Sequence, residues 1–356
     1  MLSGMREVVY GDVLPRQGLF FLAGDIGGTN SNFGILETSG KPRLVVSFHV
    51  KSQLITDYTQ LTQELCAYIK NTYDIIIQDA CFGAAGIVSE NRHYVKPTNL
   101  AVVLDAHAIK KAAGLRTFLL INDFEAVALG LDFIAPGAII VVNRGKPRGH
   151  AHKACIGAGT GLGKVALFWN NAAKCYVPVA SEGGHADCAG QTADDVEFFN
   201  FSKSIRNTES PVSWEDVLSG NGIAALYQFL GTQKNYPETE ISKEIAHNRF
   251  EPDKISLYSK EDLRCKDTFL LYARFYARCA KNFALETLAL NGLYIAGGIA
   301  AKNISIFHNP LFMEEFKKCG KYGTLLSEVP VYVIADYDIS LYGAYEFMRL
   351  HNLGIL

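Results

Sequence analysis

Apolar and polar residues alternate with two different periods along the first third of the chain. Short apolar runs bounded by turn residues predict three consecutive strands at 19–24, 32–36 and 43–50. Apolar residues at helical spacing then predict a helix over 57–72. The elements expected next are a strand at 75–82, a helix at 101–113, a strand at 117–121 and a helix at 124–131. Three strands followed by alternating helices and strands are typical of an α/β domain.

A second series of elements with the same order begins near residue 153. The expected elements are strands at 153–156, 164–169, 176–180, 293–296 and 331–335, and helices near 192–206, 221–230, 239–247, 262–290 and 341–350. The loop Gly27-Gly28-Thr29-Asn30 aligns with Ala158-Gly159-Thr160-Gly161, and each lies between two predicted strands. Such a duplication is typical of two related lobes that face each other across a cleft. Residues 1–18 precede these elements and show no clear period.

The length of the chain also favours two domains, because 356 residues exceed what one hydrophobic core usually serves. The chain is expected to cross back near Asp336, so that the final helix returns to the first lobe. The predicted lobes are therefore a small one, residues 1–133 plus 337–356, and a large one with helical insertions, residues 134–336.

The composition is that of an ordinary globular protein, with 49% hydrophobic and 20% charged residues. A net charge of −2 argues against nucleic-acid binding, which usually requires a clear basic excess. The longest apolar window, near 292–301, is too short to span a bilayer. The eight cysteines show neither C-x-x-C pairs nor zinc-ligand spacing. These features predict a cytoplasmic protein that binds neither nucleic acid nor a membrane.

Two strand corners are rich in glycine and are candidates for phosphate binding. Consecutive glycines let backbone N–H groups approach phosphate oxygens, and each predicted lobe carries one such corner, Gly27-Gly28-Thr29 and Gly159-Thr160-Gly161. A tight turn without function would explain either corner alone. Asp25 favours the functional interpretation, because a carboxylate beside a phosphate loop is well placed to hold Mg²⁺ through water.

Asn122 and Asp123 stand where a predicted strand ends and a helix begins. Asn and Asp are favoured helix caps, and capping alone would explain both residues. The same position is where open α/β sheets bind ligands, at the carboxyl ends of their strands. A hydroxyl group that attacks a phosphoryl group needs a carboxylate within reach to accept its proton. Asp123 is therefore a candidate general base, and one residue could serve both roles.

A third candidate segment, Ser181-Glu182-Gly183-Gly184-His185, places a carboxylate and an imidazole three residues apart on a glycine bend. Glu182 and His185 could both hydrogen-bond to vicinal hydroxyl groups. His185 has no cluster of cysteines near it in the sequence, so the sequence does not indicate a metal site there. In Ala296-Gly297-Gly298-Ile299, two glycines after a strand would let the backbone lie against an adenine or a ribose. A plain strand-to-helix turn would explain the same glycines.

These segments together resemble the bacterial-type glucokinases of the actin/hexokinase/Hsp70 superfamily. The matching segments are 25–30 for the first phosphate motif, 121–126 for the catalytic segment, 157–163 for the second phosphate loop, 181–185 for the sugar-binding element, 217–222 for a further family motif and 296–299 for the adenosine motif. The matches run in family order from about residue 20 to 345. The resemblance implies an α/β fold with two related lobes of the ribonuclease-H-like β-β-β-α-β-α type facing an interdomain cleft.

The resemblance also implies an activity, the ATP-dependent phosphorylation of glucose at O6, which is the first step of glycolysis. It implies that Asp123 is the general base that takes the proton from O6, with ATP and Mg²⁺ as cofactors. The implied glucose ligands are Asn99, Asp123, Glu182, His185 and Glu215. The implied nucleotide ligands are Asp25, which would also hold Mg²⁺ through water, Gly27, Gly28, Thr29, Asn30, Gly159, Thr160, Gly161, Gly297 and Gly298.

One departure from related families and three alternatives bear on this interpretation. The related ROK sugar kinases carry a Cys-rich zinc element after their Gly-His pair, and the run 186–189 has no such cluster, which excludes a typical ROK member.

Another hexose, such as mannose or glucosamine, could be the substrate, because epimers differ by a single hydroxyl orientation. A non-catalytic sugar sensor would predict loss of Asp123 and a DNA-binding extension longer than residues 1–18. An actin-like filament protein would leave Glu182 and His185 without a purpose. A homodimer and other phosphoryl donors stay open.

Overall fold

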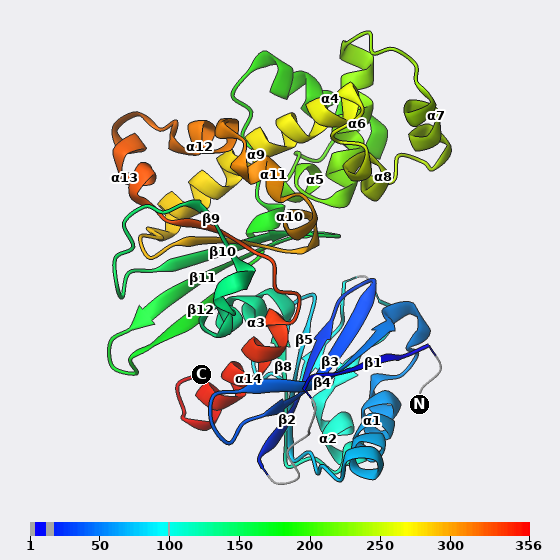
Figure 1. The fold of residues 1–356 in the computed structure, drawn as a ribbon, viewed down its shortest axis with the longest axis vertical. Helices are drawn as coiled ribbons and strands as arrows, with labels where there is room; N and C mark the ends of the chain where they lie inside the picture. Colours follow the sequence, from blue (N-terminus) through cyan, green and yellow to red (C-terminus); the bar gives the residue numbers. More distant parts are fainter. Residues whose placement is uncertain (1–3, 12–17, 99) are drawn as a thin grey trace. The chain divides into compact units, whose positions relative to one another are not determined.

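The structure is a computed structural model that describes residues 4–11, 18–98 and 100–356. In this part of the chain the strands form two six-stranded sheets and a short two-stranded ribbon (Figure 1). The described chain divides into two compact units, one made of Met1–Ile134, Asn170–Ala180 and Tyr337–Leu356 and the other of Ala135–Trp169 and Ser181–Asp336.

The first sheet combines an antiparallel meander with two parallel strands. Its strands are β1 (Arg6–Val9), β2 (Phe20–Ile26), β3 (Asn30–Glu37), β4 (Arg43–Lys51), β5 (Asp79–Ala84) and β8 (Thr117–Asn122). They lie in the order β1-β4-β3-β2-β5-β8, in which β2, β3 and β4 are antiparallel and β5 and β8 run parallel to β2. The ribbon consists of β6 (Tyr94–Val95) and β7 (Leu104–Asp105).

Helices cover both faces of the first sheet, because side chains alternate between the faces along each strand. Leu22 packs in one hydrophobic cluster with the helices α1 (Tyr58–Tyr73) and α2 (Ala106–Ala113). On the opposite face, the ring of Phe21 meets that of Tyr345 in α14 (Ile339–Asn352), which packs against α3 (Asp123–Gly130). Figure 1 shows these two helix pairs on opposite sides of the sheet.

The second sheet repeats the scheme of the first. Its strands are β9 (Ile139–Asn143), β10 (Lys153–Ala158), β11 (Leu162–Asn170), β12 (Cys175–Ser181), β13 (Leu293–Ala296) and β14 (Val331–Ile334). They lie in the order β12-β11-β10-β13-β14-β9, in which β10 and β11 are antiparallel and β13 and β14 run parallel to β10. The fold class expected from the sequence, α/β with two related lobes, is confirmed.

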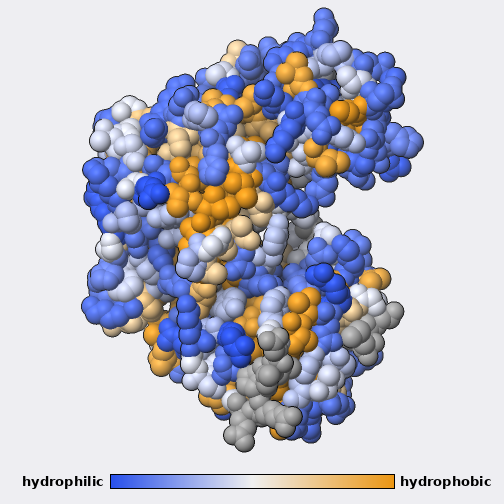
Figure 2. All heavy atoms as spheres, viewed as in Figure 1, coloured by the Kyte–Doolittle hydropathy of each residue, from blue (hydrophilic) through white to orange (hydrophobic). Residues whose placement is uncertain are grey.

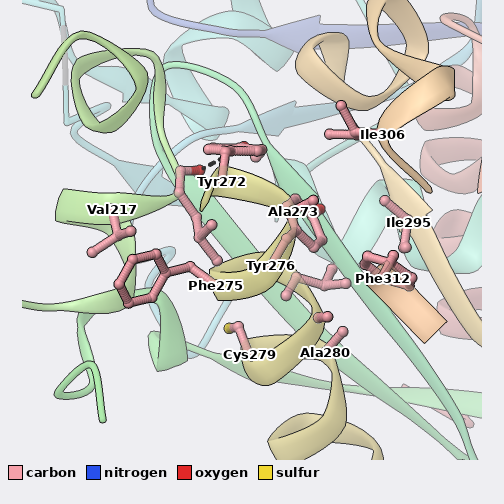
Figure 3. Packing of buried hydrophobic residues seen from close by; sticks show 14 of the residues in the cluster. Val217, Tyr272, Ala273, Phe275, Tyr276, Cys279, Ala280, Ile295, Ile306 and Phe312 are labelled. Carbon is pink, nitrogen blue, oxygen red and sulfur yellow. Dashed lines mark hydrogen bonds between the residues drawn. The ribbon is translucent and has the colours of Figure 1, made fainter. Parts of the chain in front are cut away.

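The second unit adds a thick layer of helices to its sheet. They are α4 (Ala193–Arg206), α5 (Trp214–Val217), α6 (Gly220–Gln233), α7 (Glu240–His247), α8 (Pro252–Leu257), α9 (Leu263–Thr287), α10 (Gly298–Lys302), α11 (Ile304–His308), α12 (Pro310–Lys317) and α13 (Gly323–Glu328). The central helix α9 is buried almost all round, which is typical of a helix inside a large core. Its side chains pack toward Val217 on one side and toward Ile295 and Phe312 on the other (Figure 3).

The surface over the outer helix α7 is mostly hydrophilic, as the blue spheres there show (Figure 2). Exposed large apolar residues, such as Leu257 and Leu263, are few in residues 240–263. Among the described residues, none of the helices combines the length and the apolar character that crossing a bilayer would need.

Two glycines allow α3 and α14 to pack unusually closely. A Cβ atom at Gly343 would lie 1.6 Å from the carbonyl oxygen of Ala126, and one at Gly130 would lie 2.1 Å from the carbonyl oxygen of Ile339. Because both neighbours are backbone atoms, neither can move aside without shifting a helix. These two helices carry Asp123 and Ser340, so their spacing also sets the geometry of the site described next.

Gly343→Ala should therefore lower the free energy of unfolding by about 1–3 kcal/mol, as expected for an overpacked interface. Gly40→Ala is the matched control, because no atom lies within 4 Å of the added methyl group. Denaturant unfolding of the two variants side by side measures the difference. Equal stability of both variants would contradict the close packing of α3 and α14.

Candidate active site

The first glycine corner, between β2 and β3, is held in place by hydrogen bonds to its backbone. The N–H of Gly27 donates to the carbonyl of Asn30 at 3.0 Å, which closes the turn. Ser52, which follows β4, also binds this turn. Its hydroxyl donates to the carbonyl of Gly27 at 2.6 Å, and its N–H donates to the carbonyl of Thr29 at 3.0 Å. Ser52 is buried, whereas Thr29 and Asn30 are exposed at the tip. The turn therefore offers its outer edge to a ligand while its inner edge is fixed.

Asp25 lies directly before this turn, near the carboxyl end of β2. The hydroxyl of Ser340, in the first turn of α14, donates to its Oδ2 at 2.8 Å. Burial raises the pKa of Asp25 to about 6; the hydrogen bond from Ser340 opposes this shift and the charge of Asp338 adds to it. Ser340 was not found from the sequence, because 315 residues separate it from Asp25.

Asp123 is the first residue of α3, and Asn122 rather than Asp123 occupies the cap position. The side-chain oxygen of Asn122 accepts from the N–H groups of Phe124 and Glu125, and Glu125 reaches back to the N–H of Asn122, which completes a capping box. The side chain of Asp123 accepts from the neighbouring N–H of Phe124 at 2.9 Å. The expectation that one residue serves as both cap and base is therefore wrong as far as the cap is concerned, because Asn122 already fills that role.

An ion pair between a partly exposed arginine and a buried glutamate supports the segment that carries Asp123. Both terminal guanidinium nitrogens of Arg92 donate to Glu125, at 2.8 and 3.3 Å, and Glu125 is only 3% exposed. The amide of Asn122 also donates to the carbonyl of Gly86 at 3.2 Å. Arg92 thus holds Glu125, and with it the first turn of α3, in place. The spacing of these two residues along the chain did not predict their pairing.

Asp25 and Asp123 lie at the same edge of the first sheet. In the register of the parallel strands, Asp25 is paired with Gly83 of β5, and Gly83 is paired with Ile121 of β8. Gly83 also lies beside Asp123, since a Cβ atom on it would be 3.4 Å from the Asp123 Cα. The phosphate corner and the candidate base thus meet at the carboxyl ends of parallel strands, where open α/β sheets bind ligands. Asn99, the remaining predicted sugar ligand of this unit, lies outside the described residues.

In the second unit, Glu182, His185 and Glu215 lie together although α5 and the glycine bend are far apart in sequence. The two imidazole nitrogens of His185 lie 3.9 Å from carboxylate oxygens of Glu182 and Glu215, respectively. Glu182 and His185 are about 60% exposed, so both can reach a ligand. Gly184 lets the bend lie against β11, because a Cβ atom there would be 2.0 Å from the carbonyl oxygen of Leu162.

Glu215 joins this cluster to the second glycine corner. Its Oε2 accepts from the N–H of Leu162 at 2.8 Å, directly after Gly159-Thr160-Gly161. A Cβ atom at Gly161 would lie 2.6 Å from the same carboxylate oxygen. The corner is closed by a hydrogen bond from the N–H of Gly159 to the carbonyl of Gly161 at 2.8 Å. One carboxylate therefore bonds to the predicted phosphate loop and faces the predicted sugar ligand His185.

Gly297 and Gly298 lie beside the second glycine corner. Gly297 follows β13, the parallel neighbour of β10, and has a positive φ of 91°. A Cβ atom on Gly297 would lie 2.5 Å from the carbonyl oxygen of Ala158, so only glycine fits this approach. The predicted phosphate and adenosine segments of the second unit are therefore adjacent.

Comparisons with known proteins agree with this arrangement of motifs. The glucokinase family model matches residues 22–351, which is nearly the whole chain. The chain belongs to the glucokinase family. The glucokinase of Nostoc punctiforme is 33% identical over 338 residues, which cover 91% of this chain and 97% of that protein.

Solved structures of the glucokinase fold are also similar. The crystal structure of a glucokinase from an Antarctic psychrotroph has a TM-score of 0.75 at 25% identity and covers 94% of this chain and 100% of that one. A ROK family glucokinase from Streptomyces griseus, in complex with glucose and AMPPNP, has a TM-score of 0.62 at 19% identity and covers 92% of this chain and 98% of that one. At 19% identity, the similarity to the Streptomyces griseus structure supports the fold and nothing further.

Proposed function

We propose that this member of the glucokinase family transfers the terminal phosphoryl group of ATP to O6 of glucose. The observation that carries the proposal is the position of Glu215, which bonds to the second phosphate loop through Leu162 and lies 3.9 Å from His185. A carboxylate shared by a phosphate loop and a cluster of hydroxyl-binding side chains suits an enzyme that brings a sugar to a nucleotide. The match of the family model to residues 22–351 supports the same activity.

Asp123 is the proposed general base. An O6 hydroxyl attacks the terminal phosphoryl group more readily when a carboxylate accepts its proton in the transition state. Asp123 lies at the carboxyl end of β8, and its segment is fixed by the capping box of Asn122 and Glu125. Because Asn122 serves as the cap, capping does not explain the carboxylate at position 123.

Asn99, Asp123, Glu182, His185 and Glu215 are the proposed glucose ligands. Carboxylates accept hydrogen bonds from sugar hydroxyls, and an imidazole can donate or accept one. The cluster of Glu182, His185 and Glu215 presents several such groups within one unit. No feature of the described residues favours mannose or glucosamine over glucose.

The remaining proposed ligands hold the nucleotide. Gly27, Gly28, Thr29 and Asn30 would contact phosphates through the exposed edge of their turn, as would Gly159, Thr160 and Gly161, with Gly297 and Gly298 against the adenosine. Mg²⁺ is usually bound by one or two carboxylates together with water and substrate phosphates. The residues fit such an ion, because Asp25 lies directly before the phosphate turn with a second carboxylate, Asp338, near enough to affect its pKa. When bound, Mg²⁺ would neutralise charge on the transferred phosphate.

The remaining expectations from the sequence also stay proposals. They are a small lobe of residues 1–133 plus 337–356, a large lobe of residues 134–336 and a cytoplasmic location. A homodimer is left open.

The sugar ligands can be tested by substitution. Glu182→Gln and His185→Ala should each raise the KM for glucose at least about tenfold, because a hydrogen bond to a charged group contributes about 1.5–3 kcal/mol. The KM for ATP should change much less. Steady-state kinetics with each substrate varied in turn measures both constants. If both variants raised the KM for ATP instead, the assignment of this bend to the sugar would be wrong.

A further inference from the structure

The N-terminal strand β1 lies outside the region that family membership explains, since the family model begins at residue 22. β1 pairs antiparallel with β4, and the N–H of Tyr10 extends this ladder to the carbonyl of Val45 at 2.9 Å. Met5 is buried in the hydrophobic cluster beneath the sheet, and the Tyr68 hydroxyl donates to Glu7 at 2.8 Å. The strand is therefore an integral edge of the first sheet.

Tyr10 extends from the end of β1 to the residue that precedes α14. Its hydroxyl donates to Asp338 Oδ2 at 3.3 Å and lies 3.1 Å from the hydroxyl of Ser47. In the contact with Ser47 either hydroxyl can be the donor, because each carries one proton and can also accept. Ser47 in turn lies 2.8 Å from the Nε2 of His49, so the Tyr10 hydroxyl belongs to a connected set of polar groups.

Asp338 links Tyr10 to the carboxylate beside the phosphate turn. Asp338 occupies the cap position of α14, but its side chain makes no capping hydrogen bond. Two residues later, Ser340 donates to Asp25 Oδ2 at 2.8 Å. A hydroxyl group donates to each carboxylate, Tyr10 to Asp338 and Ser340 to Asp25, and these bonds hold the two carboxylates in place.

We propose that β1 supports the nucleotide site from outside and that Tyr10 is a positioning residue, which fixes the first turn of α14 through Asp338 so that Ser340 holds Asp25 against the phosphate turn. The ligand class is a magnesium-bound nucleoside triphosphate. The inference rests on the proposed function, in which Asp25 and the 27–30 turn bind that ligand. Tyr10 itself need not touch the nucleotide.

Tyr10→Phe tests the inference, because it removes only the hydroxyl group. Binding of Mg²⁺ with a non-hydrolysable ATP analogue, measured by calorimetry, should weaken by about 3- to 10-fold, as expected for the loss of one hydrogen bond. The KM for ATP should rise in parallel, and the KM for glucose should stay within twofold. Tyr68→Phe is the matched control, because it removes a hydroxyl that fastens the same strand to Glu7 without reaching α14.

A double-mutant cycle with Ser340→Ala shows whether Tyr10 acts through Ser340. The double variant Tyr10→Phe/Ser340→Ala should bind the analogue about as weakly as Ser340→Ala alone, since residues that act through one network are not additive. Additive effects, or a Tyr10→Phe variant that binds the analogue like Tyr68→Phe, would overturn the inference while leaving the kinase activity intact. A wild-type protein without ATP-dependent glucose phosphorylation would overturn the proposed function, and this inference with it.

Discussion

Asp123→Asn is expected to lower kcat by about 10²–10⁴-fold, which is the usual effect of losing a general base. The amide keeps the shape of the side chain and an oxygen that can accept from the N–H of Phe124, but it cannot take a proton from the sugar. Glucose binding should be largely retained, since the loss falls on the transition state rather than on the ground state. Steady-state kinetics together with equilibrium glucose binding separates the two effects.

Asp105→Asn is the matched control for this experiment. Asp105 is an aspartate at the start of a helix in the same unit, where its side chain accepts from the N–H groups of His107 and Ala108 as the cap of α2. Asparagine caps helices about as well as aspartate, so this variant should keep both its stability and its kcat. Near-normal turnover in Asp123→Asn would show that position 123 has only a structural role.

Arg278→Met should lower the free energy of unfolding by about 3–5 kcal/mol, because it removes the guanidinium that bonds to two buried carboxylates, and Arg274 approaches Asp195 only to 3.9 Å. Arg278 lies inside the second unit with its side chain 2% exposed and donates to Asp195 at 2.8 Å and to Glu315 at 2.7 Å. Burial raises the pKa of Asp195, but the N–H of Gln191 and the charge of Arg278 outweigh it, so the pKa lies below its usual value. Denaturant unfolding of the variant and the wild type measures the loss.

The pH dependence of this loss checks its electrostatic origin. Burial raises the pKa of Glu315, but the hydrogen bond and charge of Arg278 outweigh it, so this pKa also lies below its usual value. The stability from both carboxylates is therefore present above their unfolded pKa and is lost as the pH falls through the folded pKa. The deficit of Arg278→Met should therefore be largest near neutral pH and shrink as the pH falls below about 4, where both carboxylates become protonated. Lys302→Met, which breaks an exposed pair with Asp253, should cost less than about 1 kcal/mol at any pH. A deficit for Arg278→Met that is equally small would contradict the buried ion triad.

The sequence predicted most of the sheet strands and long helices because each shows either a period of apolar positions or a short apolar run bounded by turn residues, as in the fully buried β10. β1 was missed because Arg6 and Val9 are exposed and Glu7 and Val8 only partly buried at the sheet edge, which leaves no periodic signal. The apolar run before β5 had the opposite effect. It predicted a strand from residue 75, but β5 begins at Asp79. Ile75 and Ile77 are buried, but burial alone does not give a segment a neighbouring strand to which its backbone can hydrogen-bond.

The candidate site was predictable where its residues are neighbours in sequence. The glycine corners, the Asn122–Asp123 pair and the Glu182–His185 bend are local patterns whose chemistry follows from residue type and spacing. The supporting contacts join residues that are far apart in the chain, as in Arg92 with Glu125 and Ser340 with Asp25. Only the folded chain brings such partners together, so spacing alone gave no sign of them.

The most direct test of the proposed function is the rate of phosphorylation of a panel of hexoses by the purified protein with ATP and Mg²⁺. Glucose, mannose, glucosamine and fructose are each varied in concentration, and the position of the new phosphate is determined by ³¹P and ¹³C NMR. The proposed function predicts the highest kcat/KM for glucose and a product phosphorylated at O6. Phosphorylation of none of these sugars, a clear preference for another hexose, or a product phosphorylated at a different oxygen would contradict it.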